Sequence, residues 1–442
     1  MNEEIIFTGL WWLPERHEEK TCGTIKYVPD ARLNLTLFGD LSAEVKKGNF
    51  SDAFIILGIN SEGKKITLFN CRHAKVQTAN KQNTNYYQIE WMFIGQHFEN
   101  EDLIKFIDIS IRFEHLENWL PVPKNTFDRI TTNQPEQLVF HLKAFDLIFY
   151  WITSTEMYKC ETRPFVEIRL DNLESFHYLI KLIHTFQDFV SLAFDDPIRI
   201  LELVASTEPI ETAPNSKIEI YHINKRNYVE KISRYDLFFT YNDVCSYFKD
   251  VMNEWYENVE RTQSVYELYF GVLYSKGMYL QHIYLSLSQA LEIYHRRKFD
   301  DKYLEEKQFE ELKGCILDSI NEHFDENISK MFENKISYLN QYTFKKRIKD
   351  ILKTLHQHNI LKWSKKERNE FVKHIGDTRD YLTHYEVEYV EYDEANFINM
   401  YKNSEIMRSI LKAYFLIDLG LPIEDIVQIL VDDPRIKEQF KL

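Results

Sequence analysis

The stretch from residue 364 to residue 385 reads SKKERNEFVKHIGDTRDYLTHY, and its spacing of apolar residues predicts an amphipathic helix. At about 100° per residue, one set of side chains falls within about 40° of a common direction and predicts a buried stripe. The members of this stripe are Phe371, Ile375, Thr378, Leu382 and Tyr385. A single apolar stripe needs other helices to cover it, so the stretch indicates a helical bundle.

The same helical spacing continues through most of the second half of the chain, where Gly and Pro are scarce. The segments with this spacing are residues 241–262, 264–273, 278–298, 309–333, 343–356, 364–385 and 393–419. Apolar residues that recur with a period of 3.6 indicate helices that bury one face. We therefore expect an all-α second half.

The first half has a different pattern, in which short runs of β-branched and aromatic residues are separated by turn residues. These runs are residues 24–28, 33–38, 54–59, 65–70, 86–94, 107–113, 137–141, 165–170 and 217–221, with one amphipathic helix at 173–193. Many short strands with regular turn signals are typical of an antiparallel β-sandwich. The sequence thus predicts a sandwich-like β-domain followed by a helical bundle, an α+β chain.

Chain length supports two domains, because 442 residues exceed the size at which a single core stops growing. The hydrophobic period changes between residues 222 and 240. We place the boundary there, which gives a β-rich domain over residues 1–222 and a helical domain over residues 223–442. The core of the helical domain is expected at about 265–420.

The formal net charge of −15 argues against a protein that coats nucleic acid without specificity. A local basic region exists nevertheless, because residues 345–368 hold nine Lys or Arg and two acidic residues, 9 − 2 = +7. Such a region is either a surface for phosphates or an ordinary solvated helix face. Composition leaves both possibilities open.

The expected compartment is the cytoplasm. The chain has no apolar run of membrane-spanning length, and its first residues lack the features of a signal peptide. Its five cysteines are far apart and form no Cys-x-x-Cys pair, which is typical of reduced thiols. We expect no membrane contact, no metal and no cofactor.

Three polar residues near the end of the 364–385 helix are candidates for catalysis. Asp380 and His384 lie one turn apart, opposite the buried stripe, and Arg379 flanks the stripe. A histidine can transfer the proton of a ribose 2'-hydroxyl, an arginine can bind the phosphate, and a carboxylate can orient the imidazole. The alternative is a surface helix on which Asp380 and His384 pair in solvent.

The motif of Arg379, four residues and His384, with an acid directly after the Arg and an aromatic directly after the His, resembles the HEPN superfamily. The name stands for higher eukaryotes and prokaryotes nucleotide-binding, and the resemblance is to its ApeA-like branch. It implies a metal-independent endoribonuclease with Arg379, Asp380 and His384 in the active site. Asn is commoner at the position of Asp380. A similar pair, Arg368 and His374, lies in the same helix but matches the family over fewer positions.

Weaker candidates lie on two segments of the helical half. Residues 285–295 are similar to a long helix of the family, and Glu292 in it is a weaker candidate for the cleft, with a helix cap or a core-edge carboxylate as the alternative. Arg368, Lys365 and Lys366 are weaker RNA-binding candidates at the start of the motif helix. The first half resembles the N-terminal domain that accompanies ApeA-like modules. The matching pieces are residues 9–14 (GLWWLP), 23–25, 33–39, 66–70, 95–98 and 116–119 (LENW).

The resemblance also implies a role in the cell: antiphage defence by abortive infection, with a nuclease half controlled by a sensing half. The implied partners are RNA, with tRNA as the first choice, a second copy bound through the HEPN domain, and a phage-derived trigger at the N-terminal domain. The implied product is a 2',3'-cyclic phosphate. The alternative is a binding protein and not an enzyme: an inactive HEPN scaffold that binds a nucleotide or a protein partner.

Overall fold

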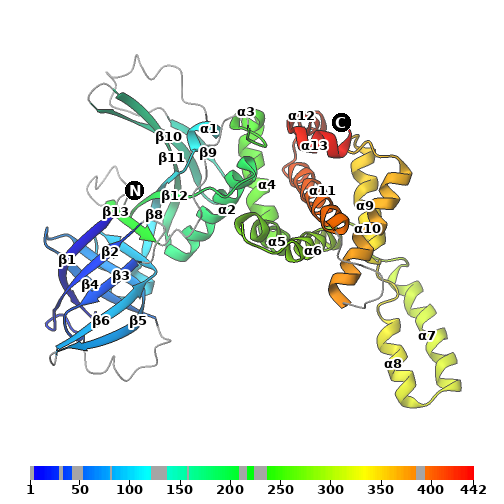
Figure 1. The fold of residues 1–442 in the computed structure, drawn as a ribbon, viewed down its shortest axis with the longest axis horizontal. Coiled ribbons are helices and arrows are strands. Elements are labelled where there is room, and N and C mark those ends of the chain that lie inside the picture. The colour runs from blue at the N-terminus through cyan, green and yellow to red at the C-terminus, as the bar shows by residue number, and fades with distance from the viewer. Residues whose placement is uncertain are drawn as a thin grey trace. The chain divides into compact units, whose positions relative to one another are not determined.

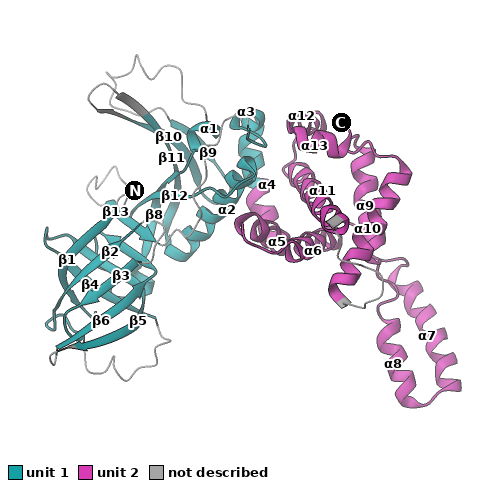
Figure 2. Cartoon of the chain, in the orientation of Figure 1, with its two compact units in different colours: residues 1–253 teal, residues 254–442 magenta. Residues whose placement is uncertain are grey.

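The chain divides into two compact units, unit 1 over Met1–Asn253 and unit 2 over Glu254–Leu442 (Figure 2). The computed structural model describes residues 4–28, 33–41, 53–79, 82–120, 137–156, 159–208, 217–222, 236–384 and 394–442. The division falls inside a helix, later in the chain than the change of hydrophobic period. The period marks where helices begin, whereas contacts assign the first of these helices to unit 1.

In its described residues, unit 1 contains thirteen strands and a few helices (Figure 1). The strands are β1 (Ile5–Trp12), β2 (Thr21–Tyr27), β3 (Leu33–Leu37), β4 (Phe54–Asn60), β5 (Lys65–Ala79), β6 (Gln82–Ile89), β7 (Trp91–Ile94), β8 (Lys105–Phe113), β9 (Gln137–His141), β10 (Asp146–Glu156), β11 (Lys159–Ser175), β12 (Ile200–Ser206) and β13 (Lys217–His222). The helices are η1 (Glu101–Leu103), α1 (Leu116–Trp119), α2 (Phe176–Phe194), α3 (Tyr241–Val244), η3 (Cys245–Tyr247) and the start of α4 (Phe248–Arg261).

The described strands form one antiparallel sheet in the order β4-β1-β2-β3-β6-β5-β7-β13-β12-β8-β11-β10-β9, with an additional pairing of β4 with β5. That pairing closes the first six strands into a ring (Figure 1). Alternate residues point inward, as in β3, where Leu33, Leu35 and Leu37 are buried and Asn34 is exposed. Trp11, fully buried, contributes to the same core. Closure leaves these six strands without an exposed edge along most of their length.

The remaining strands of unit 1 pack against α2, which contacts β8 and β11. Aromatic rings fill this second core: Trp119 lies against Phe189, and Phe149 lies against Phe186. Phe248, the first residue of α4, joins the cluster with its ring centroid 5.5 Å from that of Phe149. This contact is why the start of α4 belongs to unit 1.

The described residues of unit 2 form helices joined by short connections, with one isolated β-bridge between Lys302 and Gln341 (Figure 1). Its helices are the rest of α4, α5 (Gln263–Tyr274), α6 (Leu280–Lys298), α7 (Glu306–His323), α8 (Glu326–Ile336), α9 (Phe344–Gln357), α10 (Lys365–His384), α11 (Glu394–Asp418), α12 (Ile423–Asp432) and α13 (Pro434–Phe440). Helix α6 contacts α5, α9, α10 and α11, so it is the central helix of the unit. None of the helices in the described ranges combines the length and apolar character that a bilayer crossing requires.

The predicted α+β class, with a β-rich first half and a helical second half, is confirmed. The described strands pair into one partly closed sheet. Three strands, β1, β10 and β12, were not predicted. The prediction of a single helix over residues 309–333 is wrong. There α7 ends at His323, and Asp325 caps α8 by accepting hydrogen bonds from the backbone N–H groups of Asn327 and Ile328, at 2.9 and 3.0 Å. These local bonds begin a new helix in a new direction.

Candidate active site

Helix α10 carries the predicted motif, and a capping box fixes its start. The backbone N–H of Ser364 donates to the Glu367 carboxylate at 2.8 Å, and the backbone N–H of Glu367 donates to the Ser364 hydroxyl at 3.3 Å. Phe371, Ile375 and Leu382 are buried, which confirms those members of the predicted stripe. Thr378 is half-buried, and Tyr385 lies outside the described residues.

Arg379 projects from the side of α10 and is held by two carboxylates. Its Nη2 lies 3.4 Å from Oε2 of Glu292 on α6, and its Nη1 lies 3.2 Å from Oδ1 of Asp380. The ring of Phe344, at the start of α9, lies under the guanidinium with 5.3 Å between Cζ and the ring centroid. The Arg379 side chain remains 32% exposed, so a ligand can still reach it.

Glu292 reaches Arg379 because α6 packs directly on α10. The hydroxyl of Tyr284 donates to the backbone carbonyl of Ile375 at 3.3 Å, and Leu287 and Leu291 on α6 are fully buried. Glu292, one residue after Leu291, therefore lies at the edge of the core, with its side chain 16% exposed. The structure thus brings a weaker sequence candidate into contact with the principal one.

Asp380 and His384 are less completely described. The Asp380 carboxylate, 55% exposed, pairs with Arg379. That Asp380 orients the imidazole of His384 stays a prediction. His384 is the last residue of α10, and its side chain lies outside the described part of the structure. The hydroxyl of Thr383 donates to the backbone carbonyl of Arg379 at 2.7 Å.

The other sequence candidates lie at the opposite end of α10. Arg368 is eleven residues before Arg379, about 16 Å along the helix axis. Its Nη1 donates to the backbone carbonyl of Trp363, so it stabilises the start of α10. Lys365 and Lys366 are exposed, and Lys366 lies 3.8 Å from Glu370. The structure does not bring these three cations to Arg379.

Two buried groups beside the site escaped prediction: His295 on α6 and Arg347 on α9, both fully buried. Nη1 of Arg347 lies 3.4 Å from Nδ1 of His295. Burial lowers the pKa of His295, and the charge of Arg347 lowers it further, against the opposing effect of Asp350. We infer that His295 is neutral at pH 7. The basic end of α6 (Tyr-His-Arg-Arg-Lys) is the one sequence feature that could have indicated these groups. Their pairing could not be predicted from it, because Arg347 on α9 lies about fifty residues away in the chain.

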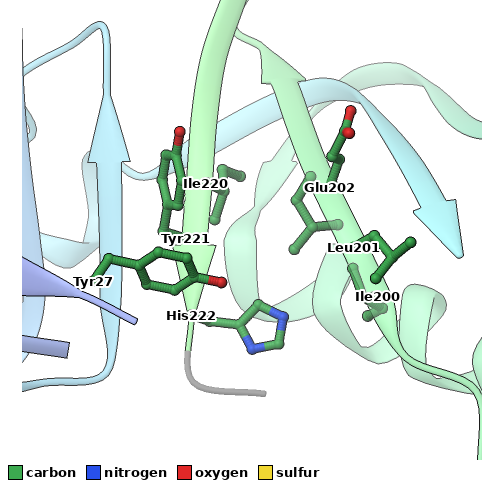
Figure 3. Close-up of a pocket in the computed structure, with 8 residues that line it drawn as sticks. Tyr27, Ile200, Leu201, Glu202, Ile220, Tyr221 and His222 are labelled. Carbon is green, nitrogen blue, oxygen red and sulfur yellow. The ribbon is translucent and has the colours of Figure 1, made fainter. Parts of the chain in front are cut away.

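A separate hollow lies in unit 1, between the closed strands and the rest of the sheet. Its lining includes Tyr27, Glu202, Tyr221 and His222. The side chain of Tyr27 points toward the imidazole of His222 (Figure 3). The Glu202 carboxylate is held by Arg112, with 2.6 Å between Nη2 and Oε1. None of the predicted catalytic residues lies in this hollow.

Comparison with protein families gives two matches. Residues 6–255 match ApeA N-terminal domain 1, and residues 285–425 match the Apea-like HEPN domain. No curated protein and no solved structure matches the chain. The HEPN match includes Glu292, Arg379 and His384, and it belongs to a domain family whose members are generally ribonucleases. The chain therefore belongs to the ApeA-like HEPN family, a family of nuclease-type defence proteins.

Proposed function

We propose that this protein is a metal-independent endoribonuclease with Arg379 and His384 as its catalytic residues. The observation that carries the proposal is the environment of Arg379: a partly exposed guanidinium, oriented by Glu292, Asp380 and Phe344, on the helix that ends at His384. Metal-free cleavage of RNA needs at least a cation that binds the phosphate and a histidine that transfers the proton. The family match supports the same reaction class.

The proposed reaction is attack by a ribose 2'-oxygen on the neighbouring phosphorus. His384 takes the 2'-hydroxyl proton, the O2'–P bond forms, the P–O5' bond breaks, and the departing 5'-oxygen takes a proton from water. The products are a 2',3'-cyclic phosphate and a 5'-hydroxyl. Arg379 binds the non-bridging oxygens and stabilises the charge that develops on them. Asp380, paired with Arg379, is proposed to orient the guanidinium.

We further propose that two copies assemble through their HEPN domains, with both His384 side chains lining one groove. Arg379 and His384 are five residues apart on α10, which places them about 7.5 Å apart along the axis and about 140° around it. One copy therefore presents the pair on different sides of the helix. A second copy related by a two-fold axis would complete the groove.

The proposed substrate is RNA, with tRNA as the first candidate because its loops expose flexible, single-stranded 2'-hydroxyls. The basic stretch 345–368, with Lys365, Lys366 and Arg368, is proposed to contact the RNA outside the reacting nucleotide. In this proposal the protein acts in the bacterial cytoplasm during abortive infection, and its N-terminal domain responds to a phage-derived trigger.

The test is to incubate the full-length protein with total RNA in excess EDTA and to sequence the RNA ends. We expect cleavage that persists in chelator and yields 5'-hydroxyl ends. The matched control is His384→Ala, which should not cleave. Strict dependence on magnesium would point to a different active site. Absence of cleavage by a folded protein, together with RNA or nucleotide binding, would favour the scaffold function.

A further inference from the structure

Glu292 is shared by two arginines that come from two different helices. Its Oε2 lies 3.4 Å from Nη2 of Arg379 on α10, and its Oε1 lies 3.0 Å from Nη2 of Arg296 on α6. Each oxygen of the carboxylate thus has its own guanidinium. The two arginines are therefore neighbours at one carboxylate, although they are 83 residues apart in the chain.

The exposure of the three groups distinguishes this arrangement from an ordinary surface pair. An exposed Glu–Arg pair four residues apart on a helix adds little to stability, because solvent screens both charges. Here the Glu292 side chain is 16% exposed, whereas those of Arg296 and Arg379 are 45% and 32% exposed. The Glu292 carboxylate is therefore mostly buried, whereas both guanidiniums reach the solvent. Because a guanidinium has five N–H donors, both retain donors for a ligand.

A third arginine, buried in the core of unit 2, increases the positive potential at this site. Arg347 on α9 is fully buried, and its pKa is lowered first by burial and then by the charge of Arg296, against the opposing effects of Asp301 and Glu292. Its Nη2 lies 3.6 Å from Asp301, beyond hydrogen-bonding distance. The field of a buried cation is screened less than that of a cation in water.

We propose that Arg296 is a second phosphate-binding residue of the site, set beside Arg379 by the shared carboxylate of Glu292. An RNA strand carries one negative charge per nucleotide, so two neighbouring guanidiniums fit two consecutive phosphates. Arg379 binds the phosphate that reacts, and Arg296 binds the adjacent one. Glu292 is then a positioning residue, which keeps two like charges together in the absence of RNA. This inference rests on the proposed RNA-cleaving function.

The test measures RNA binding in full-length protein carrying His384→Ala, so that the RNA stays intact. The probe is a short fluorescein-labelled single-stranded RNA of mixed sequence, titrated by fluorescence anisotropy at several KCl concentrations. Adding Arg296→Gln should weaken binding about five- to tenfold and lower the slope of log K against log salt by about 0.7, the loss of one phosphate contact. Arg296→Lys should restore the slope, because it retains the charge.

The matched control is Arg297→Gln, which removes the same charge one residue later, about 100° around α6. It should leave the salt slope unchanged. The inference is overturned if Arg296→Gln, with an unchanged melting temperature, binds RNA with the parent's slope, or if Arg297→Gln lowers the slope equally. Arg296→Ala is measured beside Arg296→Gln, so that the result does not depend on the glutamine side chain.

Failure of the inference can be distinguished from failure of the proposed function. If Arg379→Gln lowers the slope and abolishes cleavage while Arg296→Gln changes neither, only the role of Arg296 is wrong. If the otherwise unaltered protein does not cleave RNA and Arg379→Gln binds RNA as well as the parent, the proposed function is wrong.

Discussion

The sequence motif identified Arg379 but not the residues that orient its side chain. The spacing to His384 identified the residue, and the wheel placed it beside the buried stripe. The groups that orient its guanidinium are Glu292 on α6 and Phe344 on α9, which are 87 and 35 residues away in the chain. A motif describes one helix, and the function of an arginine depends on the helices packed around it.

Four alanine variants separate the motif from its neighbours on α10. His384→Ala and Arg379→Ala should each lower the rate of RNA cleavage by at least about a hundredfold, the usual effect of one positioned proton-transfer or charge-stabilising group. His374 is exposed, so His374→Ala should change neither the cleavage rate nor the melting temperature. Arg368→Ala should destabilise the start of α10 slightly and weaken RNA binding modestly, in a salt-dependent way.

The measurements are initial cleavage rates, melting temperatures and toxicity on induction in cells. Loss of cleavage by folded His374→Ala, with retention by His384→Ala, would show that the site assignment is wrong even though the family is right.

Among the elements, long helices with a clear apolar stripe were the most predictable. Helix α10 was expected at residues 364–385 and runs from Lys365 to His384, with Phe371 and Ile375 buried as expected. The break between α7 and α8 was missed, because Asp325 fits a helical pattern by polarity and its capping bonds are visible only in three dimensions. The closure of β4 onto β5 was unpredictable for another reason: no local signal records which distant strand completes a ring.

The contact between α6 and α10 can be tested through one hydroxyl. Tyr284→Phe removes the bond to the Ile375 carbonyl inside the core and should lower the free energy of unfolding by about 1 kcal/mol. In a unit of this size the melting temperature should fall by about 2–4 °C. Tyr279→Phe is the control, because Tyr279 precedes α6 and its side chain is 76% exposed. Equal melting temperatures for both variants would mean that the buried bond contributes nothing.

A second prediction concerns β8 and the pH dependence of stability. Burial, assisted by the charge of Glu167, raises the pKa of Asp108 from its ordinary 3.8 to about 6. The folded state therefore binds this proton more tightly than the unfolded state. The stabilisation is fully present below about pH 4 and is lost as pH rises through 6, by about 3 kcal/mol at most.

Asp108→Asn removes the titrating group, so its stability should vary less between pH 4 and 6 than that of the parent. Denaturant unfolding of both proteins at several pH values measures the difference. Parallel pH profiles for the two proteins would contradict the assignment of this proton to Asp108.

For the whole molecule, the sequence distinguished a β-rich half from a helical half, and the family matches divide the chain in the same order. Composition could not show that the first helices pack with unit 1. Phe248 and Trp119, whose rings lie 6.1 Å apart, are 129 residues apart in the chain, and no periodicity connects them.

Assembly is a prediction for the whole molecule. If two copies pair through the HEPN domain, light scattering at micromolar concentration should give about twice the 53.3 kDa of one chain. Mixing folded Arg379→Ala with folded His384→Ala protein should restore part of the activity if the groove takes its Arg from one copy and its His from the other. A mass of one chain at that concentration would rule out a stable dimer.

The two contacts between α6 and α10 restrict insertions and deletions in these helices. Tyr284 meets Ile375, and eight residues later Glu292 meets Arg379. Inserting one alanine between Tyr284 and Glu292 would keep the first contact but turn the second carboxylate by about 100° and shift it by about 1.5 Å. The number of residues between Tyr284 and Glu292 is therefore fixed by these two contacts, whereas the identity of many of those residues is not. Insertions and deletions in this interval should be depleted from a selected library far more strongly than substitutions at the same positions.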